Sequence, residues 1–278
     1  MRTLSWNCRG IGNDLTVRRL TEMCQKHRPG LVFLSETKNK RPLLQNIQAD
    51  LGFDHLFTVE PLGLSGGLAL FFMDEFQVNV LFSNNRMIDI EAVIDGIKVF
   101  MTFVYGDPVL ERRDEVWERL TRFSTTKNGP WFMIGDFNEI TCHNEKTGGR
   151  QRPDSSFLPF KQMLNDCGML EFPFTGDMLS WVGKRAGGST VRCRLDRAVG
   201  NADWHEKFPH STVKYMRLWG SDHRPILADI LIKPTRRSRK FKFDKRWLDN
   251  EDLRQVILDG WKSPDLPPNA NIMEHIAS

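Results

Sequence analysis

Short apolar segments alternate with segments of helical periodicity along this chain, and that alternation restricts it to an α/β fold. Residues 3–8 and 31–35 have the composition of buried strands, and apolar side chains recur at helical spacing between them. Pro29 and Gly30 end that helix. The chain is therefore predicted to open as strand, helix, strand.

Residues 66–105 are expected to form an antiparallel meander, because turn residues separate the apolar runs in this segment. Its four strands are expected at Gly67 to Phe72, Phe76 to Phe82, Met87 to Ile94 and Ile97 to Tyr105. We expect one helix around Trp117 and another capped by Ser155 or Ser156. Further strands are expected at residues 131–134, 179–182, 191–199, 212–217 and 226–232. The simplest architecture is two packed mixed β-sheets flanked by helices.

The composition is that of a globular protein: 278 residues, 40% of them hydrophobic, suffice for one large domain with a sizeable core. No apolar run is long enough to span a membrane, and no apolar leader follows Met1. The five cysteines are scattered without a Cys-Xaa-Xaa-Cys pair, which fits free thiols in the nucleus or the cytoplasm. Trp181, Trp204 and Trp219 are expected in the core rather than on a base-stacking surface.

A charge asymmetry separates the C-terminal segment from the rest of the chain. Lys233 to Arg246 carries +7 within a net charge of +4, so the remaining residues sum to −3. We therefore divide the chain into a domain at residues 1–232 and a partly disordered basic linker with a short helix at residues 233–278. Arg236, Arg237 and Lys240 are candidate contacts to nucleic-acid phosphates. The alternative is that this charge run is only a solvated linker.

Polar side chains stand at the ends of several predicted strands, where a ligand crevice is expected in an α/β fold. In chain order these residues are Asn7, Glu36, Tyr105, Asp136, Asn138, Asp196, Asp222 and His223. Carboxylate, amide and imidazole groups together can bind a metal, activate water and stabilise a phosphate in transfer. Taken singly, each is more often a strand cap, a turn residue or a surface acid. Asp196, between Arg194 and Arg197, can be explained as part of a local ion pair.

This ordered set resembles the endonuclease/exonuclease/phosphatase superfamily, which includes DNase I and the apurinic/apyrimidinic endonucleases, over roughly residues 1–232. The resemblance implies a DNase I-like, four-layer α/β sandwich. Several segments look most like the apurinic/apyrimidinic-like endonuclease domain of plant LINE-type (non-LTR) retrotransposons. They are Trp6-Asn7-Cys8-Arg9-Gly10, Ser35-Glu36-Thr37-Lys38, Ser65-Gly66-Gly67-Leu68-Ala69, Gly135-Asp136-Phe137-Asn138-Glu139 and Arg194-Leu195-Asp196-Arg197-Ala198. Residues 241–261 also resemble the linker that joins such a domain to a reverse transcriptase, and no polymerase sequence follows.

The resemblance implies Mg²⁺ as the cofactor, with Mn²⁺ as a substitute. Asn7 and Glu36 are the expected ligands, since they offer the oxygens that Mg²⁺ prefers. Asp222 is expected either to hold a second metal or to assist the leaving group, and the sequence leaves both open. Ser180 and Arg9 are expected to contact the substrate.

The remaining residues of the set are expected to carry the chemistry of phosphodiester hydrolysis. His223, oriented by Asp196, is expected to donate a hydrogen bond to the phosphate as charge builds on it. Asp136 is expected to orient or deprotonate the attacking water. Asn138 and Tyr105 are expected to position the phosphate.

We therefore expect a monomeric, metal-dependent endonuclease that nicks DNA and derives from a LINE-type polyprotein without its reverse transcriptase. One alternative is a phosphomonoesterase of the inositol-phosphate type, which a basic loop near the catalytic rim would favour. Another is a catalytically silent retroelement remnant that binds nucleic acid. Intact Glu36, Asp136 and His223 speak against that last alternative.

Overall fold

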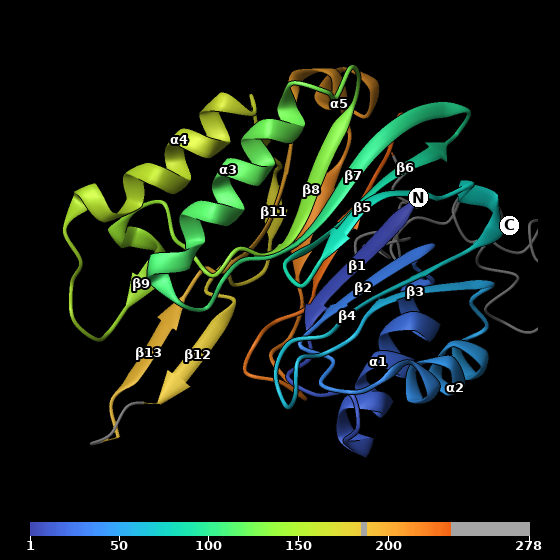
Figure 1. Ribbon diagram of the computed structural model, residues 1–278, viewed down its shortest axis with the longest axis horizontal. Coiled ribbons are helices and arrows are strands. Elements are labelled where there is room, and N and C mark those ends of the chain that lie inside the picture. Colours follow the sequence, from blue (N-terminus) through green and yellow to red (C-terminus); the bar gives the residue numbers. More distant parts are fainter. Residues whose placement is uncertain (185–187, 235–278) are drawn as a thin grey trace, which may run out of the picture. The chain divides into compact units, whose positions relative to one another are not determined.

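Two large mixed β-sheets pack face to face in the computed structural model, which describes residues 1–184 and 188–234 (Figure 1). The first sheet contains, in spatial order, β11 (Phe174–Thr175), β15 (Thr212–Tyr215), β16 (Ile226–Asp229), β1 (Arg2–Asn7), β2 (Leu31–Ser35), β4 (Leu68–Phe72) and β3 (His55–Val59). The second contains β10 (Leu170–Glu171), β14 (Asp196–Gly200), β8 (Trp131–Asp136), β7 (Ile97–Tyr105), β6 (Met87–Ile94) and β5 (Asn79–Asn84). The predicted basic linker and short helix lie, from residue 235 onward, outside the described residues.

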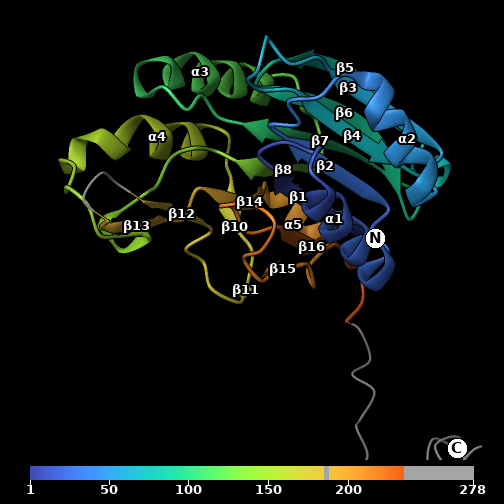
Figure 2. The same ribbon diagram turned by 90° about the horizontal axis from the view of Figure 1, so that it is seen from below.

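Helices cover the outer face of each sheet (Figures 1 and 2). The helices are α1 (Asp14–His27), α2 (Arg41–Leu51), α3 (Arg113–Ser124), α4 (Leu158–Asp166) and the short α5 (Ala202–Lys207). Helices α1 and α2 pack on the first sheet, and α3 and α4 pack on the second. The predicted four-layer α/β sandwich is therefore confirmed.

Strand β2 shows why the layers form. Leu31 and Phe33 point into the core between the two sheets, whereas Val32 and Leu34 pack toward α1 and α2. All four side chains are fully buried, since successive residues of a strand face opposite sides and here both sides are covered. A continuous apolar run therefore identifies a central strand of a sandwich rather than a surface strand.

The expected meander at residues 66–105 is wrong in one respect, because its first strand belongs to the other sheet. Strand β4 pairs with β2 and β3, whereas β5, β6 and β7 form a meander in the second sheet. The chain crosses between the sheets at a 3₁₀ turn, Asp74–Phe76, where the buried Phe76 joins the core between them.

Two further expectations need correction. The single strand expected at residues 191–199 is two strands, because β13 (Thr190–Cys193) pairs with β12 (Trp181–Lys184) and β9 (Lys146–Thr147) in a small third sheet. Helix α4 begins after a 3₁₀ turn at Asp154–Phe157, and no serine side chain caps it. None of the helices among the described residues is long and apolar enough to cross a membrane.

Candidate functional site

Strand register brings the predicted polar residues to one edge of the sandwich. The parallel strands β1 and β2 end side by side, with Asn7 opposite Ser35, and Glu36 follows directly. In the second sheet, Tyr105 lies opposite Asp136, and Asp136 lies opposite Asp196. Asn138 follows β8, and the chain reaches the same edge again just before β16 with Asp222 and His223.

His223 is the centre of a buried trio, hydrogen-bonded to Asp196 and within ion-pair distance of Asp136. Its Nδ1 lies 2.9 Å from Asp196 Oδ2, and its Nε2 lies 3.7 Å from Asp136 Oδ2. All three side chains are at most 3% exposed, so the charges interact with little screening by water. The alternative of a local ion pair for Asp196 is wrong, because Arg194 and Arg197 instead contact Glu145 and Glu171.

The trio holds opposite charges at neutral pH. Burial lowers the pKa of His223, but the carboxylates of Asp196 and Asp136 outweigh that effect and raise it to about 9. Burial raises the pKa of Asp136 to about 6, with the nearby charge of His223 opposing the rise. A charged imidazole that donates hydrogen bonds therefore faces a carboxylate that can accept a proton near neutral pH.

Asn7, Glu36 and Tyr105 form a second hydrogen-bonded group beside the trio. The Asn7 amide donates to Glu36 Oε1 at 3.0 Å and to Asp136 Oδ2 at 2.9 Å, and Tyr105 donates its hydroxyl to Glu36 Oε1 at 3.2 Å. Burial opposes ionisation of Glu36, but hydrogen bonds from Asn7 and Lys38 and the charge of Arg9 lower its pKa overall. Burial and the charge of Glu36 raise the pKa of Tyr105, which therefore stays a hydrogen-bond donor.

Asp222 lies at the same edge of the sandwich, and Arg9 contacts both Asp222 and Glu36. Arg9 Nη1 contacts Asp222 Oδ2 at 2.7 Å, and Arg9 Nε lies 3.7 Å from Glu36 Oε2. Trp181 donates its indole N–H to the same Asp222 oxygen at 3.2 Å. The structure thus brings Arg9 into the site, whereas the metal or leaving-group role of Asp222 stays a prediction.

Several residues at this edge have left-handed backbone conformations, which residues other than glycine seldom adopt. The φ angles are 50° at Arg9, 51° at Glu36, 53° at Lys38 and 54° at Asn138. Such conformations cost energy and tend to gather at functional sites, where the surrounding structure holds them in place. Asn138 is held by its amide, which donates to the Gly106 carbonyl, and by its backbone N–H, which donates to Asp136.

Ser180 forms hydrogen bonds with the backbone next to two members of the trio, Asp196 and His223. It is fully buried, and its hydroxyl oxygen accepts hydrogen bonds from the backbone N–H groups of Leu195 and Asp196 at 3.0 and 2.9 Å. Its carbonyl accepts from the backbone N–H of Arg224, the residue after His223. This geometry makes Ser180 a positioning residue for Asp196 and His223, and its predicted contact with substrate stays a prediction.

A cavity of 410 Å³ opens along this rim. Its lining includes Glu36, Asn138 and His223, together with Arg113 and Arg152. Both arginines clamp the buried carboxylate of Glu139, at 2.7 Å each.

Arg113, Arg152 and Glu139 were not among the predicted site residues, and neither was Lys38, whose Nζ lies 3.2 Å from Glu36. The only signal in the sequence is that two of these residues belong to the motif segments, Lys38 to Ser35-Glu36-Thr37-Lys38 and Glu139 to Gly135-Asp136-Phe137-Asn138-Glu139. The two arginines lie outside every motif, so their approach to the site follows from the fold alone.

The donor set fits a hard divalent cation. Glu36 offers carboxylate oxygens that its surroundings keep ionised, and the Asn7 amide lies beside it, with its nitrogen toward Glu36 and its oxygen toward the Arg9 backbone N–H. Asp136, Asp196 and His223 also have ligand atoms within 4.8 Å of one another. A protonated imidazole has no lone pair for a metal, however, so we favour Glu36 and Asn7 as ligands and the trio for proton transfer. The three predicted phosphate contacts Arg236, Arg237 and Lys240 lie outside the described residues.

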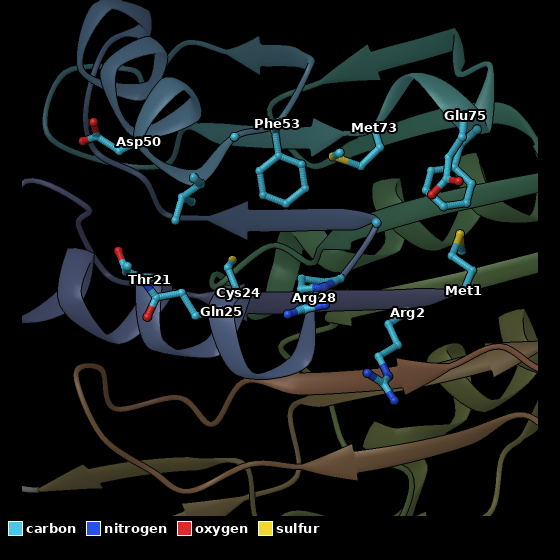
Figure 3. A pocket seen from close by; sticks show the side chains of 15 residues that line it. Met1, Arg2, Thr21, Cys24, Gln25, Arg28, Asp50, Phe53, Met73 and Glu75 are labelled. Atoms are coloured by element: carbon cyan, nitrogen blue, oxygen red, sulfur yellow. The ribbon is translucent and has the colours of Figure 1, made fainter. Parts of the chain in front are cut away.

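A different cavity, of 360 Å³, lies where β1 begins, at the edge opposite to the strand ends that carry the trio (Figure 3). Cys24 points into it from α1 and Phe53 from the segment after α2, with Asp50, Arg28 and Glu75 around it. None of the predicted site residues lines this cavity. It offers no carboxylate–imidazole pair among its lining residues, so we assign no chemistry to it.

Comparisons with known proteins agree with this geometry. The model of the family described as "Endonuclease/Exonuclease/phosphatase family" matches residues 4–223. No curated protein sequence matches the chain. Among solved structures, the AP endonuclease LMAP from Leishmania major is similar with a TM-score of 0.62 and 16% identity, covering 82% of this chain and 86% of that one.

Two other solved structures are similar in fold. An AP endonuclease from Archaeoglobus fulgidus has a TM-score of 0.62 and 14% identity, covering 83% of this chain and 99% of that one. The endonuclease domain of TRAS1, a telomere-specific non-LTR retrotransposon, has a TM-score of 0.56 and 16% identity, covering 82% and 97%. At these identities the likeness concerns the fold.

Proposed function

Because this chain belongs to the endonuclease/exonuclease/phosphatase family, we propose that it is a metal-dependent phosphodiester hydrolase that nicks DNA. The observation that carries the proposal is the buried trio of His223, Asp196 and Asp136 beside the Glu36–Asn7 pair. Hydrolysis of a phosphodiester needs a proton acceptor for water and a donor for the charged phosphate, and the trio supplies both.

Each residue has a role that follows from its contacts. Asp136 accepts the proton of the attacking water, because its pKa of about 6 leaves it ionised at neutral pH. His223 donates a hydrogen bond to the phosphate oxygens, and Asp196 keeps the imidazole charged and oriented. Tyr105 and Asn138 position the phosphate at the rim, where both lie beside these groups.

Glu36 and Asn7 would hold the cation, and we propose Mg²⁺ with Mn²⁺ as a substitute. When bound, such a cation neutralises the non-bridging oxygens and stabilises the leaving 3′ oxygen. Arg9, which already contacts Glu36 and Asp222, is placed to contact a substrate phosphate at the same rim.

We propose DNA as the substrate and a LINE-type retroelement as the source of the chain. The fold likeness to the endonuclease domain of a non-LTR retrotransposon supports this source, and the motifs that resemble plant LINE endonucleases refine it. A nuclear or cytoplasmic location and a monomeric state are part of the same proposal. The basic C-terminal segment would add affinity for phosphates.

The test is nicking of supercoiled plasmid by the purified full chain, with Mg²⁺ and with excess EDTA. We expect conversion to the open circle only with the metal, and the Asp136→Asn variant as a matched control should leave the plasmid supercoiled. Conversion by the variant at the wild-type rate would contradict the proposal. Release of phosphate from inositol phosphates without nicking would favour the phosphomonoesterase. Absence of both activities, with DNA binding retained, would favour the catalytically silent remnant.

A further inference from the structure

A third cavity, with a strong excess of positive charge, runs between α1 and β15 on the outside of the first sheet. We call it the α1–β15 groove; its volume is 370 Å³, and its charged lining consists of Arg19, Lys26, Lys214, Arg217 and a single carboxylate, Glu22. Figure 2 shows α1 beside β15 and β16. The proposed catalytic roles involve none of these residues.

Positive charges also surround the one histidine of the groove. His27 lines the groove, and its pKa is lowered by burial and by the charges of Lys214, Lys26 and Arg2. Only Arg19 among the four groove cations has an ion-pair partner in the described residues, Glu22 at 3.7 Å. The charge of the groove is therefore largely available to an anion.

An exposed aromatic side chain stands where the loop leaves the groove toward the catalytic rim. Trp219 is 40% exposed, so the expectation that it belongs to the core is wrong, whereas Trp204 is fully buried as expected. The Arg19 guanidinium lies 5.5 Å from the Trp219 ring centre, on one face of the ring. The exposure leaves part of the indole surface open to a ligand.

The loop that carries Trp219 is fixed to both α1 and the catalytic edge. Arg19 donates to the Arg217 carbonyl, and Thr16 donates its hydroxyl to the Gly220 carbonyl. Gly220 has a φ of 82°, and an added Cβ would lie 3.3 Å from the Arg19 side chain. Ser221 then donates its hydroxyl to the Asn7 carbonyl at 2.8 Å. The ring is thus held in place rather than carried on a free loop.

We propose that the α1–β15 groove binds a single-stranded segment of nucleic acid, with an unpaired base stacked on Trp219. Cations along a groove combined with an aromatic platform are what single-strand binding requires, because the cations attract the phosphates and any base can stack. A paired base is stacked inside its duplex and cannot reach the indole. The site lies next to the catalytic rim but does not depend on nicking, so it goes beyond the proposed function.

The opposite face of α1 lacks this excess of positive charge. Thr21, Cys24 and Gln25 line the other cavity, which Figure 3 shows, and that cavity has a mixed lining that includes Asp50 and Glu75. The excess of positive charge is therefore a property of the face of α1 that meets β15.

The experiment measures binding of the full chain to fluorescent oligonucleotides by anisotropy in EDTA, so that metal-dependent cleavage cannot interfere. Trp219→Ala should weaken binding of a single-stranded oligothymidine about 5- to 150-fold, the equivalent of about 1–3 kcal/mol. Trp219→Phe should retain most of the affinity, and affinity for a matched duplex should change less than about twofold.

Charge reversal provides a second variant that does not touch the aromatic ring. The double variant Lys214→Glu, Arg217→Glu should lower the salt slope of log K for the single strand by ~0.7 for each phosphate that the groove no longer neutralises. Lys161→Glu, on the exposed side of α4, is the matched control and should leave affinity unchanged.

The proposal is overturned if Trp219→Ala, still folded by its thermal midpoint, binds the single strand like the wild type. It is also overturned if duplex and single strand lose affinity equally, which would indicate a general backbone contact. Competition by polyglutamate that is as strong as competition by the oligonucleotide, and equally sensitive to charge reversal, would assign the groove to an acidic peptide instead. Plasmid nicking is scored separately, so failure of one proposal leaves the other standing.

Discussion

The opposite charges of Asp136 and His223 set the pH range in which the site works. Asp136 must be ionised to accept a proton, so the rate should fall as pH drops through about 6. His223 must stay charged to donate to the phosphate, so the rate should also fall as pH rises through about 9. We predict a bell-shaped profile of kcat/KM for nicking at saturating metal. A profile that stays flat from about pH 5 to about pH 10 would contradict these roles.

The raised pKa of His223 also affects the free energy of unfolding. The folded-state pKa of His223 lies above the ordinary value of 6.5, so the charged imidazole stabilises the fold fully below that value. This contribution should be lost as pH rises through about 9, and His223→Ala should lack that loss in denaturation curves.

Substitutions in the trio should separate catalysis from folding. His223→Ala and Asp196→Asn remove charge that acts in the transition state, so kcat should fall by ~10² or more while KM changes little. His210→Ala, an exposed histidine, is the matched control and should keep full turnover. Loss of DNA binding with normal turnover in either trio variant would mean that the pair is structural.

Glu36 is the charged ligand of the proposed metal site. Glu36→Ala should remove most nicking, because it costs several kcal/mol of transition-state charge stabilisation. The variant should also weaken Mn²⁺ binding in a calorimetric titration, and this readout is independent of turnover. Glu75→Ala, at an exposed position, should bind Mn²⁺ like the wild type. Unchanged Mn²⁺ affinity in the Glu36 variant would remove Glu36 from the ligand set.

At the scale of elements, a buried ion-pair network fixes β14 to the segment before β9. Arg197 is fully buried and contacts Glu145 at 2.7 Å, while Arg194 contacts the other oxygen of Glu145 at 3.0 Å. Glu145→Ala leaves two buried guanidinium groups short of a partner, so we predict a loss of about 3–5 kcal/mol in the free energy of unfolding. Chemical denaturation checks this value. Glu118→Ala breaks an exposed ion pair and should cost less than about 1 kcal/mol.

The elements that the sequence predicts well are those with a local signature. Strand β2 is a continuous apolar run, and α1 has helical spacing ended by Pro29-Gly30, so both were found. The sheet to which β4 belongs was not predictable, because a change of partner sheet leaves no mark in the alternation of residues. The break between β13 and β14 is hidden for a related reason, since Arg194 lies between them and is buried through carboxylates that are distant in sequence.

The residues of the site also fall into those with a local signature in the sequence and those without one. Motifs at strand ends identified the residues that the structure brings together, including His223 beside Asp196 and Asp136. The partners that lie far away in sequence were missed, because only the fold brings Arg113 and Arg152 to Glu139. The sequence predicts Trp219 in the core because tryptophan is highly buried on average, and nothing in the sequence reports its exposure.

At the scale of the whole molecule, charge is divided unevenly along the chain. Residues 233–246 carry +7 and the remainder carries −3. We predict that truncation after Ile232 leaves a folded, active domain that binds DNA more weakly, with the salt slope reduced by ~0.9 for each phosphate that the removed segment had neutralised. Thermal midpoints and salt-dependent affinities of both forms test this. An unchanged affinity and slope in a folded truncated form would show that the segment is only a solvated linker.

The position of β16 also determines when during synthesis the protein can act. This late strand inserts between β15 and β1, and Met1 and Ile230 exchange backbone hydrogen bonds at its end. A ribosome-bound chain that has released β1 through β14 already displays Glu36, Asp136 and Asp196 but still lacks His223. Since domains fold as units, the growing polypeptide should be unable to cleave nucleic acid until β16 emerges, and a stop codon anywhere before β16 should abolish activity.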